Sequence, residues 1–396
     1  MTVAPIAHAL GLHMHQPPEN LRFLIDKYDG EAERIIRCYD RAQRWAHACA
    51  DVARLHVGFS GILLEQLLDP AIVDLYRRWV EIPAMLDGYR TADNIEVVGT
   101  GYYHPIFPLI PMEDWEDQLI RGRQILETVF GRAPEGFWPP QMGFCMEMIP
   151  ALAKAGYTYV IVDSVYVRPT CGMMDIYRPY RATYDGCSIA IIPRERHLSC
   201  AQESGMDLSW FTQEAGSRIA HGLGPGTLRL LTTWSDGENG GWFRETYEPS
   251  GFFGRFFAPY VEAVRSGGIP LRLVMLSNYL DEHPPAEDAS VQTGAWDVGS
   301  TSDVDFRRWG GSEAQRRALA AIGEVSGHYW RLMNSDTPLP KDAQTALARA
   351  RPLILEGEAS CFLDWGESWI PRLYERTAPA KLLLLEAEAT LAATVH

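Results

Sequence analysis

The sequence predicts an α/β fold, with a parallel (β/α) barrel of seven or eight strands followed by a C-terminal helical domain. Over the first 280 residues, short apolar runs alternate with amphipathic stretches, which is typical of βα units around a mainly parallel sheet. From Ser312 onward, Leu and Ala recur at spacings of three and four residues, which indicates helices. We therefore expect a barrel domain in residues 1–285, a connecting segment in 286–311 and a helical domain in 312–396.

Apolar runs give the expected strands, which are Ala7–His13, Leu55–Ser60, Ile95–Thr100, Gly136–Trp138, Tyr157–Asp163, Ser188–Ile192, Leu228–Thr233 and Leu271–Leu276. Amphipathic stretches between them give the expected helices, among them Ile35–Cys49, Pro70–Asp87, Met112–Phe130 and Cys145–Ala155. The C-terminal periodicity predicts three more helices, Ser312–Asn334, Lys341–Leu355 and Pro379–Thr394. Between the first two of these, the run from Asn334 to Pro338 has turn chemistry.

The composition of the chain limits which partners it can bind and in which compartment we expect it. A chain of 396 residues, 46% hydrophobic, can bury a large core, and its net charge of −15 argues against nucleic acid or an anionic membrane as partner. No run of 18 apolar residues is present, and Met1 to His13 lacks the basic start of a secretory signal, so we expect a cytoplasmic protein. Seven cysteines without CxxC spacing indicate reduced thiols rather than a disulfide framework or a zinc site. The oligomeric state is left open.

Polar clusters directly follow four of the expected strands. They are His13 to Pro17, Gly101 to Pro105, Trp138 to Gln141, and Ser235 to Asn239. The C-terminal ends of the strands in a parallel barrel converge on one face, and that face carries the chemistry. We therefore expect these clusters to line one pocket, with His13 and Asp236 less than about 15 Å apart.

The histidines of these clusters allow several interpretations. His13 and His15 alternate on a strand and point to the same side, so they could bind a metal, bind sugar hydroxyls or belong to the core. A metal needs further ligands, and no second histidine pair of the HxxxH kind follows, so we expect no metal and no cofactor. His104 follows a strand beside two tyrosines, which favours contact with a ligand over simple packing.

The acids and aromatic residues favour a sugar site. Asp236 and Glu238 could merely cap a turn, but two acids bracketed by Trp234 and Trp242 favour catalysis or sugar binding. The chain has 12 Trp and 17 Tyr, and many lie beside Gly, Pro and acids, among them Trp296, Trp365 and Trp369. Aromatic faces stack on the C–H faces of sugar rings, although any one Trp could equally serve as packing.

Taken together, the motifs resemble glycoside hydrolase family 57. His13 to Pro17 is similar to the family's first motif, Ile95 to His104 to the second, Phe137 to Met142 to the third and Trp234 to Asn239 to the fourth. Arg308 to Ser312 resembles the start of the family's helical region. This resemblance implies a seven-stranded (β/α) barrel followed by helices, and a retaining enzyme that hydrolyses or transfers α-linked glucose chains.

The resemblance also assigns site residues. It makes Asp236 the acid/base and puts Gln141 where the family has its glutamate nucleophile. An amide cannot attack an anomeric carbon, so hydrolysis by this chain is in doubt, and Glu147 is too displaced along the following helix to replace the nucleophile. In a retaining site the two carboxyl groups lie about 5–5.5 Å apart, so we expect the ends of Gln141 and Asp236 about 5–7 Å apart. The expected sugar contacts are His13, His15, Glu19, Tyr103, His104, Trp138, Trp234, Glu238, Trp242 and Trp309.

Three functions remain open. The first, which we favour, is a retaining α-glycan hydrolase or transglycosylase with a deliberate Gln substitution at position 141. The second is a non-catalytic relative that binds glycans, and the third is a metal-dependent deacetylase or mannosidase that uses His13 and His15. The expected partner is an oligosaccharide or polysaccharide, with neither the sugar nor the linkage fixed.

Overall fold

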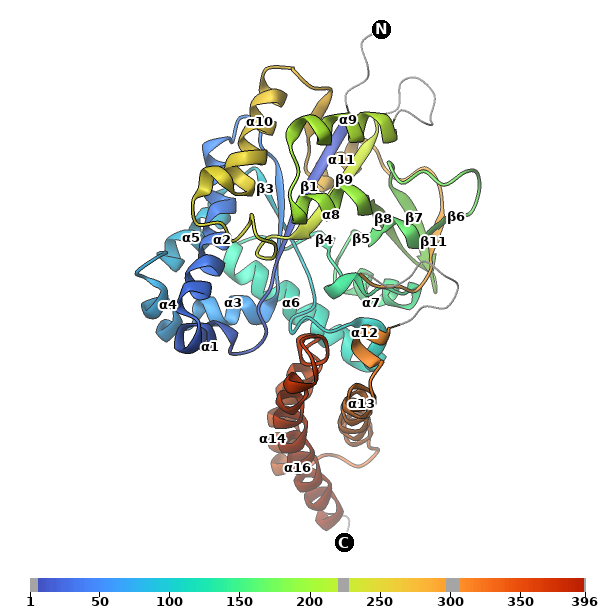
Figure 1. Ribbon diagram of the computed structural model, residues 1–396. Helices are drawn as coiled ribbons and strands as arrows, with labels where there is room; N and C mark the ends of the chain where they lie inside the picture. The colour runs from blue at the N-terminus through green and yellow to red at the C-terminus, as the bar shows by residue number, and fades with distance from the viewer. Residues whose placement is uncertain (1–5, 220–227, 297–305, 395–396) are drawn as a thin grey trace.

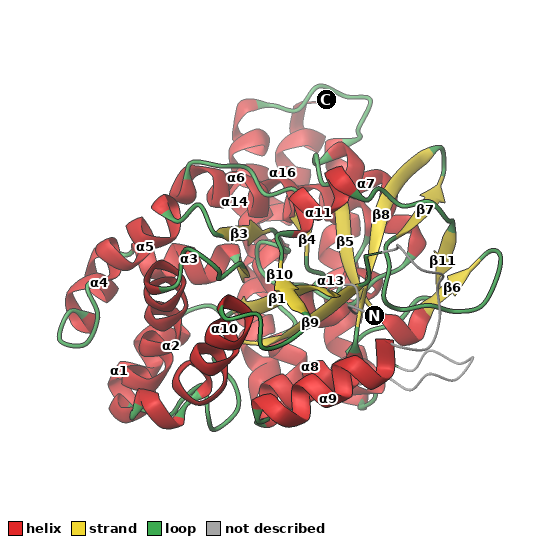
Figure 2. Ribbon diagram, turned by 90° about the horizontal axis from the view of Figure 1, so that it is seen from above, coloured by secondary structure: helices red, strands yellow, loops and turns green. Residues whose placement is uncertain are grey.

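In the computed structural model, which describes residues 6–219, 228–296 and 306–394, parallel strands occupy the middle of the molecule and most helices lie outside them (Figures 1 and 2). Strand β1 (Ile6–Met14) is fully buried and pairs in parallel with β9 (Leu230–Asp236) and β2 (Leu55–Phe59). Strand β2 in turn pairs with β3 (Ile95–Val98). Burial on both faces explains why these strands are nearly continuous apolar runs in the sequence.

A second group of parallel strands closes the barrel. It consists of β4 (Gly136–Phe137), β5 (Tyr159–Asp163) and β8 (Cys187–Arg194). A parallel bridge between Gly99 and Phe137 joins β3 to β4. The N–H of Glu195 donates to the carbonyl of Thr232 at 2.8 Å and joins β8 to β9. The ring order is therefore β1-β2-β3-β4-β5-β8-β9, which confirms the predicted (β/α) barrel with seven strands.

The eighth expected strand lies outside the ring. Strand β10 (Leu271–Leu273) pairs in parallel with the first three residues of β1, where β2 makes no pairs. The remaining residues of the expected strand start helix α11 (Leu276–Glu282) or lead into it.

Three short strands at the side of the barrel were not expected. Strand β7 (Tyr180–Tyr184) forms an antiparallel hairpin with β8 through the turn residues Asp185 and Gly186, both with positive φ. An Asp-Gly pair is a strong signal for such a turn, so this hairpin was detectable in the sequence. Strands β6 (Val167–Pro169) and β11 (Ala289–Val291) pair with each other and have no comparable local signal.

Several barrel helices lie close to their expected positions, and one differs. Helix α6 (Trp115–Phe130) begins three residues after its expected start, α2 (Asp29–Ala48) begins six residues before the expected Ile35, and α7 (Ile149–Lys154) begins four residues after the expected Cys145. The stretch expected as one helix from Pro70 to Asp87 is instead α4 (Pro70–Tyr76) and α5 (Ile82–Thr91). Pro83 lies in the first turn of α5, and a proline there cannot continue a preceding helix. Further helices are α1 (Asn20–Lys27), α3 (Gly61–Leu68), α8 (Arg196–Ser204), α9 (Leu208–Ile219) and α10 (Ala258–Arg265).

The C-terminal helices extend from the end of the barrel at which the strands finish (Figure 1). They are α12 (Arg307–Gly310), α13 (Glu313–Met333), α14 (Lys341–Gly357), α15 (Cys361–Asp364) and α16 (Ile370–Thr394). Helix α13 begins at a capping box, in which Ser312 and Gln315 bond each other's backbone N–H. Helix α16 begins nine residues before the expected Pro379, which lies within it. The expected domain limits at 285 and 312 stay predictions.

A buried ion pair attaches these helices to the barrel. The guanidinium of Arg351 on α14 lies 2.5 Å from the carboxylate of Asp114, which precedes α6 and also accepts from Trp330 Nε1 at 2.7 Å.

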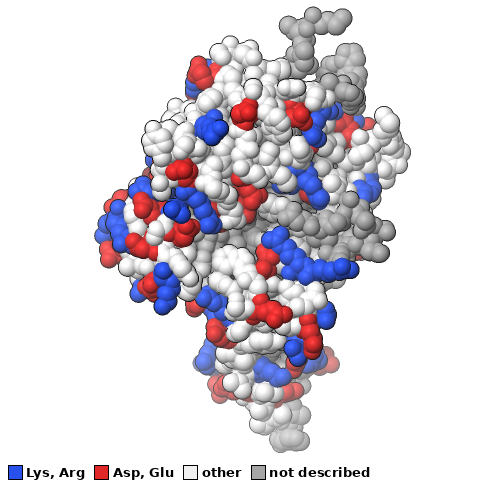
Figure 3. Space-filling model, viewed as in Figure 1, with Lys and Arg blue, Asp and Glu red and all other residues white. Residues whose placement is uncertain are grey.

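On the outer surface, acidic and basic side chains are interspersed over the face shown in Figure 3. Within the described residues, no helix has the length and apolar character needed to cross a membrane.

Stacked tryptophans fill the interior of the barrel. The rings of Trp138 and Trp234 are fully buried, 5.2 Å apart and nearly parallel. Gly11 on β1 is the register partner of Trp234, and a Cβ atom there would lie 2.0 Å from the indole ring. The glycine is thus required by the close approach of the ring, and Trp234 holds the strand whose end carries Asp236.

Candidate active site

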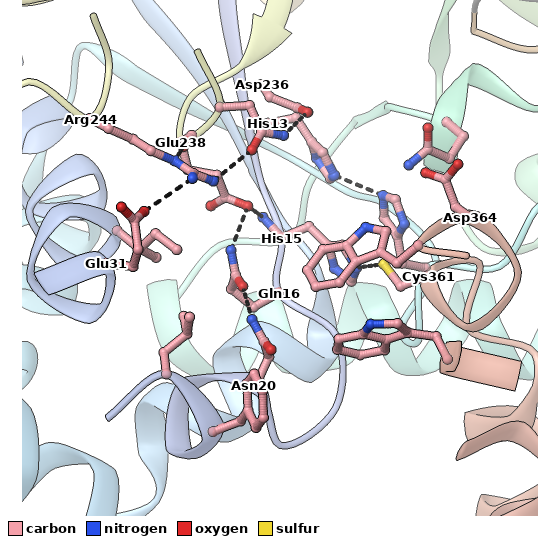
Figure 4. Close-up of a pocket in the computed structure, with 18 of the residues that line it drawn as sticks. His13, His15, Gln16, Asn20, Glu31, Asp236, Glu238, Arg244, Cys361 and Asp364 are labelled. Carbon is pink, nitrogen blue, oxygen red and sulfur yellow. Dashed lines mark hydrogen bonds and ion pairs between the residues drawn. The ribbon is translucent and has the colours of Figure 1, made fainter. Parts of the chain in front are cut away.

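A pocket of about 560 Å³ lies where the barrel strands end, and the C-terminal helices form part of its wall (Figure 4). Six residues expected in the site line it, and these are His13, His15, His104, Gln141, Asp236 and Glu238. They come from the ends of β1, β3, β4 and β9, so the expected convergence of the polar clusters is observed. The pocket combines carboxyl, imidazole and aromatic groups, a composition that suits a polar ligand with apolar faces.

Asp236 occupies the last position of β9, directly beside β1. It is the register partner of His13, and the N–H of Gly237 donates to the His13 carbonyl at 2.8 Å. Burial raises the pKa of Asp236 to about 6, although a hydrogen bond from Asn239 and the charge of Arg194 act in the opposite direction. A carboxyl group with this pKa can exchange a proton near neutral pH.

Glu238 lies two residues further on and is almost completely buried. Its Oε1 accepts from the backbone N–H of His15 at 3.0 Å and from the Gln16 amide at 3.2 Å. Its Oε2 forms no well-aligned hydrogen bond with the described residues. Burial is the main cause that raises the pKa of Glu238 to about 8, although the neighbouring Tyr39 hydroxyl interacts with the carboxyl and acts to lower its pKa. The charge of Asp236 adds to the rise.

Gln141 lies in a tight turn after β4 with unusual backbone geometry. Its φ of 52° and the φ of 54° at Met142 place two consecutive non-glycine residues in the left-handed region. Its carbonyl accepts from the N–H of Trp296 at 2.6 Å. Such conformations cost about 1–3 kcal/mol each and cluster at functional sites, where the surroundings hold them in place. The expected separation of 5–7 Å between Gln141 and Asp236 stays a prediction.

The three histidines form a neutral cluster, in which His13 and His104 are hydrogen-bonded and His15 stacks on His104. Nε2 of His13 lies 2.8 Å from Nε2 of His104, whose Nδ1 lies 3.0 Å from Ser360 Oγ. His15 places its Nδ1 2.7 Å from Ser60 Oγ. Burial lowers the pKa of His13 to about 3 and those of His15 and His104 well below the ordinary value. The imidazoles are therefore uncharged at neutral pH and can donate to or accept from hydroxyl groups.

Six other expected contact residues do not line the pocket. Trp138 and Trp234 are fully buried in the barrel, and Trp309 is fully buried among the C-terminal helices. Tyr103 packs against Ile62 and Leu355. These four side chains are used for packing, so the geometry does not support their contact with a sugar.

The remaining two residues are occupied elsewhere. Trp242 donates from Nε1 to the carbonyl of Gln202 at 2.9 Å and packs on Phe252. Glu19 lies in a neighbouring hollow, is largely exposed and pairs with Arg376 at 3.2 Å. Their expected contacts with a sugar stay predictions.

The sequence did not predict that the C-terminal helices form a wall of the pocket, although Trp365 and Trp369 were expected among the aromatic residues suited to a sugar cleft. This wall contains Cys361 and Asp364 from α15, and Trp365 and Trp369 just after it. Trp365 is 43% exposed, and its ring lies 4.6 Å from that of Trp369. Two tryptophans separated by a Gly-containing turn were a usable signal for an aromatic surface. Nothing in the local sequence, however, predicts that α15 lies against the barrel. Trp296, another of the expected aromatic residues, also lines the pocket, and the lining residues that were not expected include Phe23, Tyr28, Glu31, Glu203, Arg244 and Arg308.

Comparison with known proteins shows which family this sequence matches. The model of glycosyl hydrolase family 57 matches residues 9–292. Alpha-amylase 1 of Dictyoglomus thermophilum is 27% identical over 251 residues, which make up 61% of this chain and 32% of that protein. The 4-alpha-glucanotransferase of Thermococcus kodakarensis is 24% identical over 286 residues, or 69% of this chain and 39% of that protein. The chain thus spans about a third of the length of these curated relatives.

Solved structures share the fold along nearly the whole chain. A GH57-type branching enzyme from Pyrococcus horikoshii superposes with a TM-score of 0.71 at 17% identity, covering 97% of this chain and 88% of that one. The alpha-amylase AmyC from Thermotoga maritima superposes with a TM-score of 0.65 at 16% identity, covering 98% and 97%. At these identities the likeness shows the fold alone.

Proposed function

Because the chain belongs to glycosyl hydrolase family 57, we propose that its pocket binds an α-linked glucan chain in the manner of a retaining glycosidase or transglycosylase. In this proposal Asp236 is the acid/base and Gln141 occupies the position of the nucleophile. The relatives named as alpha-amylases and 4-alpha-glucanotransferases support the substrate class.

The observation that carries the proposal is the meeting of Asp236, Gln141 and three neutral histidines in one pocket. Asp236 has a pKa of about 6, so an appreciable fraction of the carboxyl is protonated near neutral pH and can donate to a leaving oxygen. Uncharged imidazoles suit sugar hydroxyls because each ring offers one donor and one acceptor. The exposed face of Trp365 suits the apolar face of a sugar ring.

With glutamine at position 141, the chain binds the α-glucan but hydrolyses it very slowly. In a retaining enzyme a carboxylate oxygen attacks the anomeric carbon while the acid protonates the departing glycosidic oxygen, and water later cleaves the resulting ester. The amide oxygen of Gln141 carries no charge and is a poor nucleophile, so the first step fails even with Asp236 protonated. Glutamine has the size and shape of glutamate, so substrate binding is retained.

Restoration of the carboxylate tests this proposal. Isothermal titration should show that the chain binds maltooligosaccharides, with hydrolysis lower than that of Gln141→Glu by several orders of magnitude. Asp236→Asn added to that variant should remove the activity again. Gln344→Glu is the matched control, because it adds the same charge at an exposed position on α14. Hydrolysis by the unaltered chain at ordinary enzyme rates would contradict the assignment of position 141.

A second candidate function, a non-catalytic glycan-binding protein, is favoured by the same glutamine. It predicts that the chain binds maltooligosaccharides but that Gln141→Glu remains inactive, because other parts of a catalytic site are missing. The rescue experiment therefore separates the two functions.

A further inference from the structure

Two histidines and a cysteine come together on one side of the pocket, and the proposed glycosidase chemistry does not use the cysteine. His15 follows β1 and Cys361 begins α15, and Figure 4 shows the two side chains facing each other. His104 follows β3, so three distant segments contribute. One nitrogen of each imidazole and the sulfur of Cys361 lie within 4.8 Å of one another, and all three side chains are buried. Nε2 of His15 is 3.1 Å from Cys361 Sγ.

Serine hydroxyls fix the outer nitrogens of both rings. Ser60 Oγ lies 2.7 Å from His15 Nδ1, and Ser360 Oγ lies 3.0 Å from His104 Nδ1. Partners of this kind orient the histidines of metal sites and leave the opposite nitrogen free to bind the ion. Nε2 of His15 already faces the thiol of Cys361, whereas Nε2 of His104 is hydrogen-bonded to Nε2 of His13 at 2.8 Å and must leave that partner to bind an ion.

We propose that His15, His104 and Cys361 bind a divalent transition metal ion of the zinc class, with an open coordination position toward the pocket. Imidazole nitrogen and thiolate sulfur are the ligands that Zn²⁺ prefers, and sites with three protein ligands leave a fourth position for water or another ligand. Ions such as Ca²⁺ and Mg²⁺ prefer oxygen ligands and do not suit this set.

The three side chains lie close enough to share one ion, but hydrogen bonds and ring stacking now hold them in another arrangement. Zn–N distances of about 2.0–2.1 Å and a Zn–S distance of about 2.3 Å place nitrogen and sulfur about 3.5 Å apart in a tetrahedral site. The observed 3.1 Å between His15 and Cys361 must therefore open slightly. The rings of His15 and His104, stacked with centroids 3.8 Å apart, must turn so that both lone pairs meet the ion. Binding also releases the thiol proton of Cys361 and breaks the hydrogen bond between His104 and His13.

The metal would compete with the sugar, and this part of the inference rests on the proposed function. His15 and His104 line the pocket in which we place the glucan chain. An ion that holds their Nε2 atoms removes them as partners for sugar hydroxyls. Zinc therefore acts as an inhibitor of glycan binding.

Cobalt spectroscopy of the full chain tests the metal site directly. Protein freed of metal by a chelator, and then of the chelator, should bind one Co²⁺ with a thiolate-to-cobalt charge-transfer band. The band should disappear in Cys361→Ser and persist in Cys200→Ser, which removes an exposed thiol on α8. Titration with Zn²⁺ should show affinity at least about 100-fold weaker in Cys361→Ser, and about 10-fold weaker in Ser60→Ala. Circular dichroism confirms that each variant is folded.

The outcomes separate the metal site from the glycan function. Absence of the charge-transfer band in the parent chain, or its persistence in folded Cys361→Ser, overturns the metal site whatever the sugar results are. If Zn²⁺ binds but leaves the Kd for maltooligosaccharides unchanged, the competition is overturned. If Zn²⁺ binds and the chain binds no α-glucan with or without a chelator, the proposed function fails and the metal site stands.

Discussion

His13 and Asp236 are register partners on the neighbouring parallel strands β1 and β9. Each is at or next to the end of its strand, and the N–H of Gly237 donates to the carbonyl of His13. The carboxyl is thereby fixed at the same level as the imidazole, in a place where burial opposes its ionisation. Its protonation state then depends on which charges face it across the pocket.

Replacement of Gln141 by glutamate should raise the pKa of Asp236 above its present value of about 6. A second carboxylate at close range disfavours ionisation of the first, because like charges repel in a poorly solvated site. Carbon-13 NMR titration of the aspartate carboxyls should show the shift, with Asp236→Asn identifying the signal. An unchanged or lower pKa would mean that positions 141 and 236 do not face each other.

The pH profile of that variant should follow from the same group. The acid must be protonated to donate, so kcat/KM should fall as the pH rises through the raised pKa of Asp236. A profile that instead keeps rising above neutral pH would exclude Asp236 as the proton donor.

Glu238→Gln should stabilise the protein at alkaline pH. The folded-state pKa of Glu238, about 8, lies above the ordinary value of 4.5. The neutral form therefore favours folding below pH 4.5, and this contribution is lost as the pH rises toward 8. Glutamine keeps an acceptor oxygen for the N–H of His15 and cannot ionise. The Tm of the variant should exceed that of the parent at about pH 9, and the difference should shrink at about pH 5.

Glu386→Gln is the matched control for this measurement. The residue is exposed on α16, so the same chemical change there should leave the Tm nearly unchanged at either pH. If Glu238→Gln lowers the Tm at about pH 9, the carboxylate form is stabilised in the folded state and the burial argument is wrong.

The sequence was sufficient to predict the barrel and the part of the site carried by its strands. Buried parallel strands are mostly apolar, with a few buried polar residues such as His56 and Glu96, and clusters of polar residues follow where the strands end. The site residues His13, His15, His104, Gln141, Asp236 and Glu238 could therefore be expected together. Closure of the ring was harder to foresee, since it depends on isolated links such as that between Gly99 and Phe137.

The expectations about tryptophan show where sequence reasoning ends. Trp138 and Trp234 stand beside polar residues in the sequence, yet their rings fill the barrel interior, because side chains alternate along a strand and only one set faces the interior. Trp365 and Trp369 reach the pocket through the packing of α15 and its flanking turn against the barrel. That packing is a long-range contact, and the periodicity of a helix does not specify it.

Trp365→Ala should weaken binding of maltooligosaccharides. The exposed ring of Trp365 lines the pocket beside Trp369, and we take the contribution of a stacked sugar to be that of an aromatic pair, about 0.5–1.5 kcal/mol. Isothermal titration should show Kd rising about 3- to 10-fold. Tyr247→Ala removes another exposed aromatic ring, which lies outside the pocket, and should leave Kd unchanged. Equal effects of the two substitutions would argue against a sugar contact at Trp365.

Gly11→Ala should destabilise the barrel and disturb the site through Trp234. A Cβ atom at Gly11 would lie 2.0 Å from the indole, so the ring or the strand must move. Such overpacking costs about 3 kcal/mol or more in free energy of unfolding, because the ring is enclosed and cannot yield freely. Gly30→Ala is the control, since its Cβ would meet no atom within 4 Å and α2 should gain up to about 1 kcal/mol.

Because Trp234 lies two residues before Asp236 on β9, displacement of the ring should also shift the acid. In the Gln141→Glu background, Gly11→Ala should therefore lower both kcat and Tm. Gly30→Ala should lower neither kcat nor Tm. If folded Gly11→Ala protein kept full activity and stability, the contact between Gly11 and Trp234 would not be what positions the end of β9.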